Sequence, residues 1–152
     1  MANTKKDAAI IKALRALSNA LNSYQQAKSV QSVPAEYQKI FSDVVELHIA
    51  LRDSLIQRFE FCVDLLWKYA KKYLENTEQV TLEVKTPRST IRALCTARLI
   101  SESQAEQALE MIRHRNMTSH IYREEIAEII AQQIPAHYDL MSHIVQVIEH
   151  RV

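Results

Sequence analysis

The chain contains no glycine among its 152 residues. Glycine is the residue that tight hairpin turns, phosphate-binding loops and dinucleotide-binding folds use where the backbone needs a positive φ. Its absence removes the Walker-type and Rossmann-type phosphate loops and favours helices. With 47% hydrophobic and 24% charged residues, residues 1–152 are expected to form one globular domain with a sizeable core.

The charges nearly cancel, with 19 Lys and Arg against 18 Asp and Glu. No global field therefore attracts nucleic acid, and any such binding must come from a local patch. Cys62 and Cys95 lie in apolar helical patterns without a metal-binding spacing and are predicted to be buried, reduced thiols. Residues 5–21 are basic and amphipathic but lack a continuous apolar run, so we expect a cytoplasmic protein without a membrane span, with a transit peptide as the alternative.

Apolar residues recur at spacings of three and four through most of the chain, which predicts amphipathic helices. The first is expected over residues 4–28. The second is expected from Pro34 to about Glu75, and a helix of about 60 Å is expected to bend or break, near Asp53 and Ser54. Residues 76–85 lose the helical period and are predicted to form an extended loop.

Two helix starts are marked by capping residues. Thr86 followed by Pro87 predicts an N-cap and a first helical position, beginning a short helix to about Arg98. Ser101 and Gln104 have the capping-box spacing and predict the start of the next helix.

The last helix is expected over residues 123–150, with a kink at Pro135. Its predicted core stripe consists of Ile126, Ile130, Ile134, Met141, Ile144 and Ile148. Helices joined by connections of a few residues predict an all-α fold, an up-and-down bundle of four to five helices.

Residues 113–122 collect cationic and titratable side chains where helix propensity is poorest. Asn116, Thr118 and Ser119 compete with the backbone for hydrogen bonds, so the helix is expected to end or loosen there.

On an unbroken helix Arg115 and His120 would lie about 140° apart, whereas Arg115 and Tyr122 would share a face. If Arg115 and His120 serve one substrate, the helix must change course between them or a second subunit must supply one of them.

Such a set has the chemistry to cleave an RNA phosphodiester without a metal ion. The planar fork of Arg115 matches a phosphate, and His120 can move protons to and from a ribose 2′-hydroxyl and the leaving oxygen. The alternative is purely structural: Arg115 pairs with a carboxylate of the bundle, His120 caps a helix end and Tyr122 packs at a helix entrance.

Several stretches of the chain carry a family resemblance. They are residues 52–61, 66–68, 73–75, 86–88, 91–92, 99–100, 115–122 and 124–125. In this order they resemble the nucleotidyltransferase substrate-binding protein family, a branch of the HEPN superfamily. The resemblance covers about residues 52–134, and the part before it is matched only by its helical pattern.

The resemblance implies a HEPN-like four-to-five-helix bundle that forms a homodimer, needs no cofactor or metal, and works as a toxin beside a minimal nucleotidyltransferase antitoxin. In HEPN ribonucleases an Arg-x4–6-His motif supplies the phosphate-binding arginine and the catalytic histidine, which fall on Arg115 and His120, often with a polar residue after the arginine, here Asn116. In related toxin–antitoxin pairs the nucleotidyltransferase AMPylates the tyrosine of Arg-x4-His-x-Tyr, here Tyr122, which silences the nuclease.

The chain departs from the family pattern at two positions. His114 stands where the family usually has an acidic residue, and Arg98 stands where it often has a glycine. The first departure removes a possible orienting carboxylate beside Arg115.

Two further groups of side chains have competing interpretations. Lys68, Lys72, Arg88 and Arg92 are predicted to contact RNA or a nucleotide, with a solvated face as the alternative, while the aromatic residues among them (Trp67, Tyr69 and Tyr73) either stack on bases or pack in the core. His137, His143 and His150 are spaced six and seven apart, which suits a solvated or partly buried stripe better than a metal site.

Three functions remain open from the sequence. The first is the AMPylation-controlled ribonuclease, the second a non-catalytic substrate-binding subunit of a two-component nucleotidyltransferase, and the third a helical dimerisation module without chemistry.

Overall fold

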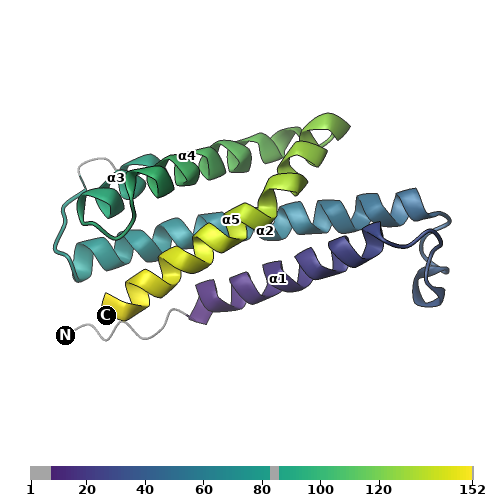
Figure 1. The fold of residues 1–152 in the computed structure, drawn as a ribbon, viewed down its shortest axis with the longest axis horizontal. Coiled ribbons are helices and arrows are strands. Elements are labelled where there is room, and N and C mark those ends of the chain that lie inside the picture. Colours follow the sequence, from purple (N-terminus) through teal and green to yellow (C-terminus); the bar gives the residue numbers. More distant parts are fainter. Residues whose placement is uncertain (1–7, 83–85, 152) are drawn as a thin grey trace.

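The computed structural model describes residues 8–82 and 86–151, and within these ranges it is built from helices alone. The elements are α1 (Ala8–Lys28), the 3-10 helix η1 (Ala35–Tyr37), α2 (Val44–Asn76), α3 (Pro87–Thr96), α4 (Glu102–Met117), the 3-10 helix η2 (Thr118–His120) and α5 (Glu124–Arg151). α1 and α4 run antiparallel to the long α2, α3 lies by the end of α2, and α5 crosses the bundle diagonally (Figure 1). The predicted all-α bundle is confirmed.

The five α-helices share one apolar core. The predicted stripe of α1 is buried along its whole length (Ile10, Leu14, Leu17, Leu21 and Tyr24), and so is that of α5 except for the half-buried Ile126. α2 contributes the largest share and packs against all four other α-helices. Each fully buried Leu, Ile or Phe stabilises the fold by about 1.5–3 kcal/mol relative to exposure, so these stripes hold the helices together.

The predicted start of the second helix at Pro34 is wrong. Pro34 begins only the single turn of η1, and α2 starts at Val44, capped by Asp43, whose carboxylate accepts a hydrogen bond from the backbone N–H of Glu46 at 2.8 Å. Ile40, which fits the apolar period, is 71% exposed. The period alone extended the helix too far, because an apolar residue on a helical spacing carries no information about whether a core lies beside it.

α2 is one continuous helix of 33 residues through Asp53 and Ser54, so no break occurs there. At 1.5 Å per residue it is about 50 Å long. In Figure 1 its last turns lie beside α3 and the first turns of α4, while α1 accompanies its earlier part. One uninterrupted helix therefore supplies both core side chains and the side chains that contact Arg115 at the end of α4.

The helix starts at the two capping signals are confirmed. The Thr86 side chain accepts from the backbone of Ser89, with Pro87 in the first turn, and Ser101 and Gln104 make both reciprocal hydrogen bonds of a capping box, at 2.9 and 3.1 Å. α3 ends at Thr96, two residues before the predicted end.

Two non-glycine residues occupy left-handed backbone positions after helix ends. Gln79 follows α2 with φ 55°, and Arg98 follows α3 with φ 61°. At the second position the backbone N–H of Leu99 reaches back to the carbonyl of Leu94 at 3.0 Å, which closes the helix end. A glycine would adopt this conformation freely, whereas a side chain costs about 1 kcal/mol there, so the departure at Arg98 from the family glycine carries a stability cost.

The connection after α2 has no regular structure over residues 77–82, as predicted; residues 83–85 of the predicted loop, and residues 4–7 of the predicted first helix, lie outside the described residues. α5 stays helical through Pro135, and Figure 1 shows it changing direction part-way along its length. None of the described helices combines the length and the hydropathy that a membrane crossing requires.

Candidate functional site

The helix predicted to loosen near Asn116 does so. α4 ends at Met117, the η2 turn follows, and α5 begins at Glu124. The hydroxyl of Thr118 turns back to donate to the carbonyl of Arg115 at 2.7 Å, which satisfies one of the free carbonyls at the helix end. The break therefore leaves Arg115 on the last turn of α4 and moves His120 onto a separate turn.

Arg115 is held by carboxylates of α2. Its Nε and Nη2 donate to the two oxygens of Asp64 at 2.9 and 3.0 Å, and Nη2 lies 3.4 Å from Glu60. Its Nη1 donates to the hydroxyl of Thr118 at 3.1 Å. The hydrogen bond to Asp64, more than any other contact, raises the pKa of Arg115 above its ordinary value. The bidentate pair fixes the plane of the guanidinium and leaves it charged.

The sequence did not reveal that these two carboxylates lie beside Arg115. The sequence indicated only that His114 removes a possible orienting carboxylate directly before Arg115, whereas Glu60 and Asp64 supply carboxylates from one face of α2. The only sequence signal was the spacing of four between these two acids, which lie on the same helix face. Arg115 therefore pairs with carboxylates of the bundle, as the purely structural interpretation of this residue predicted.

His120 and Tyr122 lie together on the exposed turn. The Tyr122 side chain is 76% exposed, and its hydroxyl is 3.5 Å from Nδ1 of His120, with the rings edge to face at 6.0 Å between centroids. Tyr122 thus does not pack at a helix entrance. Asn116 is also exposed. Within the described part of the chain no hydrogen bond joins Arg115 to His120.

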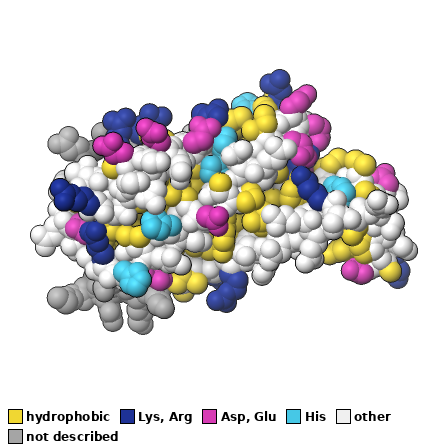
Figure 2. Space-filling model, in the orientation of Figure 1, with side chains coloured by type: hydrophobic (Ala, Val, Ile, Leu, Met, Phe, Trp, Pro, Cys, Tyr) yellow, Lys and Arg dark blue, Asp and Glu magenta, His cyan; other side chains and the backbone are white. Residues whose placement is uncertain are grey.

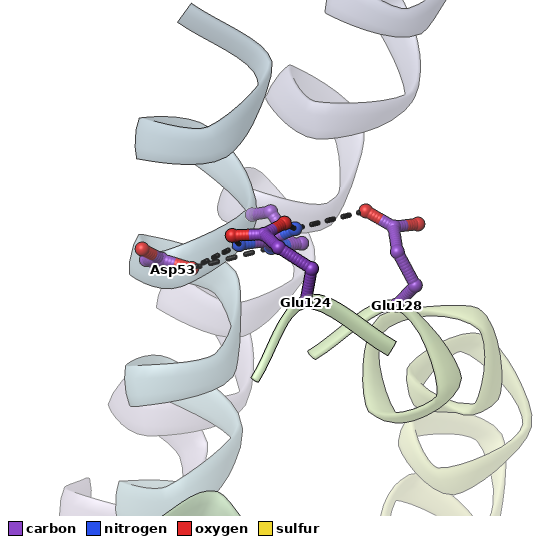
Figure 3. A network of polar contacts seen from close by, with 4 residues as sticks. Asp53, Glu124 and Glu128 are labelled. Atoms are coloured by element: carbon purple, nitrogen blue, oxygen red, sulfur yellow. Dashed lines mark hydrogen bonds and ion pairs between the residues drawn. The ribbon is translucent and has the colours of Figure 1, made fainter. Parts of the chain in front are cut away.

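A buried arginine anchors the start of α5 directly after this turn. Arg52 is 3% exposed, and its guanidinium donates to Glu124 at 2.6 Å, to Glu128 at 3.1 Å and to Asp53 at 3.2 Å (Figure 3). The hydrogen bond from Arg52 lowers the pKa of Glu124. No spacing in the sequence indicated this network, which ties the first turns of α5 to α2.

The four predicted RNA-contacting residues are all exposed. Lys68 and Lys72 lie one and two turns along α2 from Asp64, and Arg88 and Arg92 lie on α3. On the face shown in Figure 2, basic side chains are mixed with acidic ones, and acidic side chains gather over the first turns of α5. No extended basic patch therefore marks this face.

The aromatic residues among those cations belong to the core: Trp67, Tyr69 and Tyr73 are at most 7% exposed. The base-stacking interpretation is wrong for them. Burial raises the pKa of the Cys62 thiol to about 12, and Cys95 is half-buried; both are free. The prediction of a buried reduced thiol is confirmed for Cys62 and only partly for Cys95.

The histidines of α5 do not form a common site. His137 is buried, whereas His143 and His150 are exposed. Among the described residues, no three His, Cys, Asp or Glu side chains lie close enough together to hold a metal ion.

His137 instead forms a buried pair with His114, the residue before Arg115. Nε2 of His114 lies 3.2 Å from the carboxylate of Glu110, and its Nδ1 lies 2.7 Å from Nε2 of His137, which stacks on Phe59. Because a carboxylate only accepts, Nε2 of His114 donates to Glu110, and Nδ1 of neutral His114 accepts from His137. These hydrogen bonds connect α4 to α5 at the residue directly before Arg115.

The buried pair makes stability depend on pH. Burial, above all, lowers the pKa of His137 to about 4 and also lowers that of His114. Below pH 6.5 His137 becomes protonated in the unfolded chain but stays neutral in the folded chain. The stability that is present above pH 6.5 is therefore lost as the pH falls towards 4. We expect His137 to contribute a loss of about 3 kcal/mol in the free energy of unfolding over this range.

Urea unfolding at a series of pH values measures this effect. His137→Gln keeps a hydrogen-bonding side chain that does not titrate, so its stability should depend less on pH. The matched control is the exposed His143→Gln, which should keep the wild-type pH dependence. If the free energy of unfolding changed with pH equally in the wild type and in His137→Gln, His137 would not be the source of the pH dependence.

The chain was compared with models of protein families, with curated proteins and with solved structures. The model of the family described as nucleotidyltransferase substrate binding protein like matches residues 8–149. No curated protein is similar enough to count as a match.

Three solved structures share the fold. A crystal structure of a Thermus thermophilus protein is 24% identical, with a TM-score of 0.63 over 87% of this chain and 98% of that one. A mutant MntA–HpeT toxin–antitoxin structure is 17% identical, with a TM-score of 0.62 over 93% and 98%. A tri-AMPylated Shewanella oneidensis HEPN toxin in complex with MNT antitoxin is 17% identical, with a TM-score of 0.61 over 95% and 98%.

At these identities the solved structures establish a shared fold, while the family model spans almost the whole chain. The protein therefore belongs to the nucleotidyltransferase substrate binding protein like family and has the helical fold of the HEPN toxins.

Proposed function

We propose that this protein is a HEPN-type endoribonuclease that needs no metal ion, works as a homodimer and is silenced when a minimal nucleotidyltransferase antitoxin AMPylates Tyr122. The observation that carries the proposal is the grouping at the break between α4 and α5. There Arg115 presents an oriented guanidinium, and the exposed Tyr122 hydroxyl lies 3.5 Å from His120.

The proposed reaction uses the chemistry of the substrate itself. The ribose 2′-oxygen loses its proton and forms a bond to the adjacent phosphorus, and the bond from phosphorus to the 5′-oxygen breaks as that oxygen gains a proton. His120 moves these protons, Arg115 stabilises the charge on the phosphate, and Asn116 supplies a polar contact. The products carry a 2′,3′-cyclic phosphate and a 5′-hydroxyl.

A second copy of the protein completes the proposed active site, because Arg115 and His120 of one chain do not contact each other. Since Arg115 is turned towards α2 and His120 lies on the exposed turn, a cleft between two copies supplies the second set of both side chains. Lys68, Lys72, Arg88 and Arg92 then hold the RNA on either side of the cleft through its phosphates.

Silencing follows from the position of Tyr122. Its phenolic oxygen forms a bond to the α-phosphorus of ATP, the phenolic proton leaves, and pyrophosphate departs. The adenylyl group is then attached within reach of His120 and brings a negative charge that repels the RNA backbone. The AMPylated toxin in complex with an MNT antitoxin among the structural relatives supports this step.

The substrate-binding-subunit function has one observation in its favour. Two carboxylates, Glu60 and Asp64, neutralise Arg115 in the single chain. A polyanion must compete with them before it reaches the guanidinium, whereas a partner protein does not need Arg115 to be free.

RNA cleavage separates the two functions. The purified protein, incubated in EDTA with single-stranded RNA, is expected to yield fragments with 2′,3′-cyclic phosphate ends, and an all-DNA strand of the same sequence should stay intact because it lacks the attacking hydroxyl. If RNA stays uncut at all protein concentrations while the protein still binds a nucleotidyltransferase, the subunit function holds and the ribonuclease proposal fails.

Mass spectrometry tests the silencing step. With ATP and the partner nucleotidyltransferase, the peptide containing Tyr122 should gain AMP and cleavage should stop. Tyr122→Phe should remain active under the same treatment, while Tyr37→Phe, a matched change at another exposed tyrosine, should still be silenced. Silencing of Tyr122→Phe would refute the assignment of Tyr122.

A further inference from the structure

A stripe of exposed and half-buried side chains runs along the outer face of α2, between α1 and Arg115 at the end of α4. Its centre is Phe61, which is 45% exposed although Phe59, two residues earlier, is fully buried. The stripe consists of Arg58, Phe61, Asp64 and Leu65, and Lys68, one of the proposed RNA contacts, lies one turn beyond Asp64 at its end. Together with Ala9, Lys12, Ala13 and Ala16 of α1 it lines an open groove of about 510 Å³. The small side chains of α1 leave the room in which a large side chain fits.

We propose that this stripe is the homodimer interface, with α2 packed antiparallel against α2 of a second copy and Phe61 on the two-fold axis. Arg58 and Asp64 lie three residues before and three residues after Phe61. An antiparallel crossing centred on Phe61 therefore sets Arg58 of each copy opposite Asp64 of the other. A two-fold interface must be self-complementary, and this spacing provides one apolar contact between two symmetric ion pairs.

The two central charges of the stripe, Arg58 and Asp64, do not pair with each other within one chain. Arg58 and Asp64 are six residues apart on the same helix, a spacing at which side chains do not meet. Within the described residues Arg58 has no ion pair, whereas Asp64 is bound to Arg115. Among the described residues Arg58 therefore lacks a carboxylate partner, and the proposed interface supplies one.

The same contact bears on the proposed active site. Both oxygens of Asp64 accept from Arg115, at 2.9 and 3.0 Å. When Arg58 of the second copy also binds Asp64, the carboxylate is shared between two guanidinium groups and its hold on Arg115 weakens. Dimerisation then makes Arg115 available to a phosphate, which couples assembly to the proposed nuclease.

A second copy fits the stripe better than a strand of RNA does. Lys12, Arg58 and Lys68 surround the groove and attract a polyanion, but Asp64 lies among them and Glu60 lies one turn away. RNA would bring its phosphates against these carboxylates, whereas a second copy brings an arginine to Asp64 and an aromatic ring to the alanines.

Charge exchange tests the interface. Analytical ultracentrifugation over a concentration series should give a dimer weaker by about tenfold or more for Arg58→Asp and for Asp64→Arg, because each places like charges across the two-fold axis. The double variant should recover the dimer to within a few-fold of wild type. Arg92→Asp, an equivalent change on α3 away from the stripe, should dimerise as wild type does, and thermal unfolding checks that each variant is folded.

Cross-linking gives a second measurement at the two-fold axis. In a Cys95→Ser background, Phe61→Cys should form a disulfide-linked dimer on mild oxidation, since the two introduced thiols face each other. Ile129→Cys, at a comparably exposed position on α5, should form little disulfide-linked dimer under the same conditions.

The outcomes separate this interface from the proposed function on which it rests. An unaltered dimer in both single variants, a double variant no better than the singles, or a protein that is monomeric at every concentration would overturn the interface. If Arg58→Asp loses RNA binding without any change in assembly, the groove is an RNA surface instead. A dimer that behaves as expected but does not cut RNA leaves the interface standing and rejects the nuclease.

Discussion

Replacing His120 by alanine is expected to lower the rate of RNA cleavage by about 10²–10⁴-fold, the usual contribution of a positioned proton-transfer group. The fold should not change, because the His120 side chain is exposed and its contact with Tyr122, at 3.5 Å, is at the limit of a hydrogen bond. Initial cleavage rates in EDTA, measured beside thermal unfolding curves, give both quantities.

The neighbouring change Ser119→Ala is the matched control for His120→Ala. Ser119 lies on the same exposed turn and donates only to the carbonyl of Asn116, at 3.3 Å, so its loss should leave the cleavage rate within a few-fold of wild type. Equal activity of His120→Ala and wild type would reject His120 as the proton-transfer group. An equal loss in Ser119→Ala would mean that the shape of the turn, and not the imidazole, matters.

Replacing Arg52 by alanine is expected to destabilise the fold by about 3 kcal/mol, the lower end of the range for breaking a buried ion pair. The guanidinium is 3% exposed, but its partners Asp53, Glu124 and Glu128 are 43–62% exposed and can be rehydrated, which limits the loss. The cost arises from the cavity and from three carboxylates left without a cation. For a chain of this size the midpoint of thermal unfolding should fall by roughly 10 °C.

Urea unfolding measures the loss, with Arg92→Ala as the control. Arg92 is exposed on α3, so its truncation should change the free energy of unfolding by less than about 0.5 kcal/mol. An Arg52→Ala protein as stable as this control would contradict the proposed anchoring of α5. Because the network begins two residues after Tyr122, the variant should also make the η2 turn more accessible to limited proteolysis.

Several local features were predictable because they depend on neighbouring residues. The capping box of Ser101 and Gln104 formed as expected, and the helix loosened after Asn116, where side chains compete with the backbone. Such interactions span three or four residues and are encoded in their spacing. The same reasoning failed at Ile40, since a helical period does not reveal whether a core lies beside it.

The sequence by itself determined the helical class, most helix boundaries and the segment in which Arg115, His120 and Tyr122 occur. Only the tertiary structure decided what these residues touch: Arg115 meets Asp64 across 51 residues of sequence, and Arg52 meets Glu124 across 72. Such contacts depend on which faces of distant helices pack together, and no local spacing encodes that choice. The physical reason is that helix formation is governed within one turn, whereas the partners of a charge are set by the packing of the whole bundle.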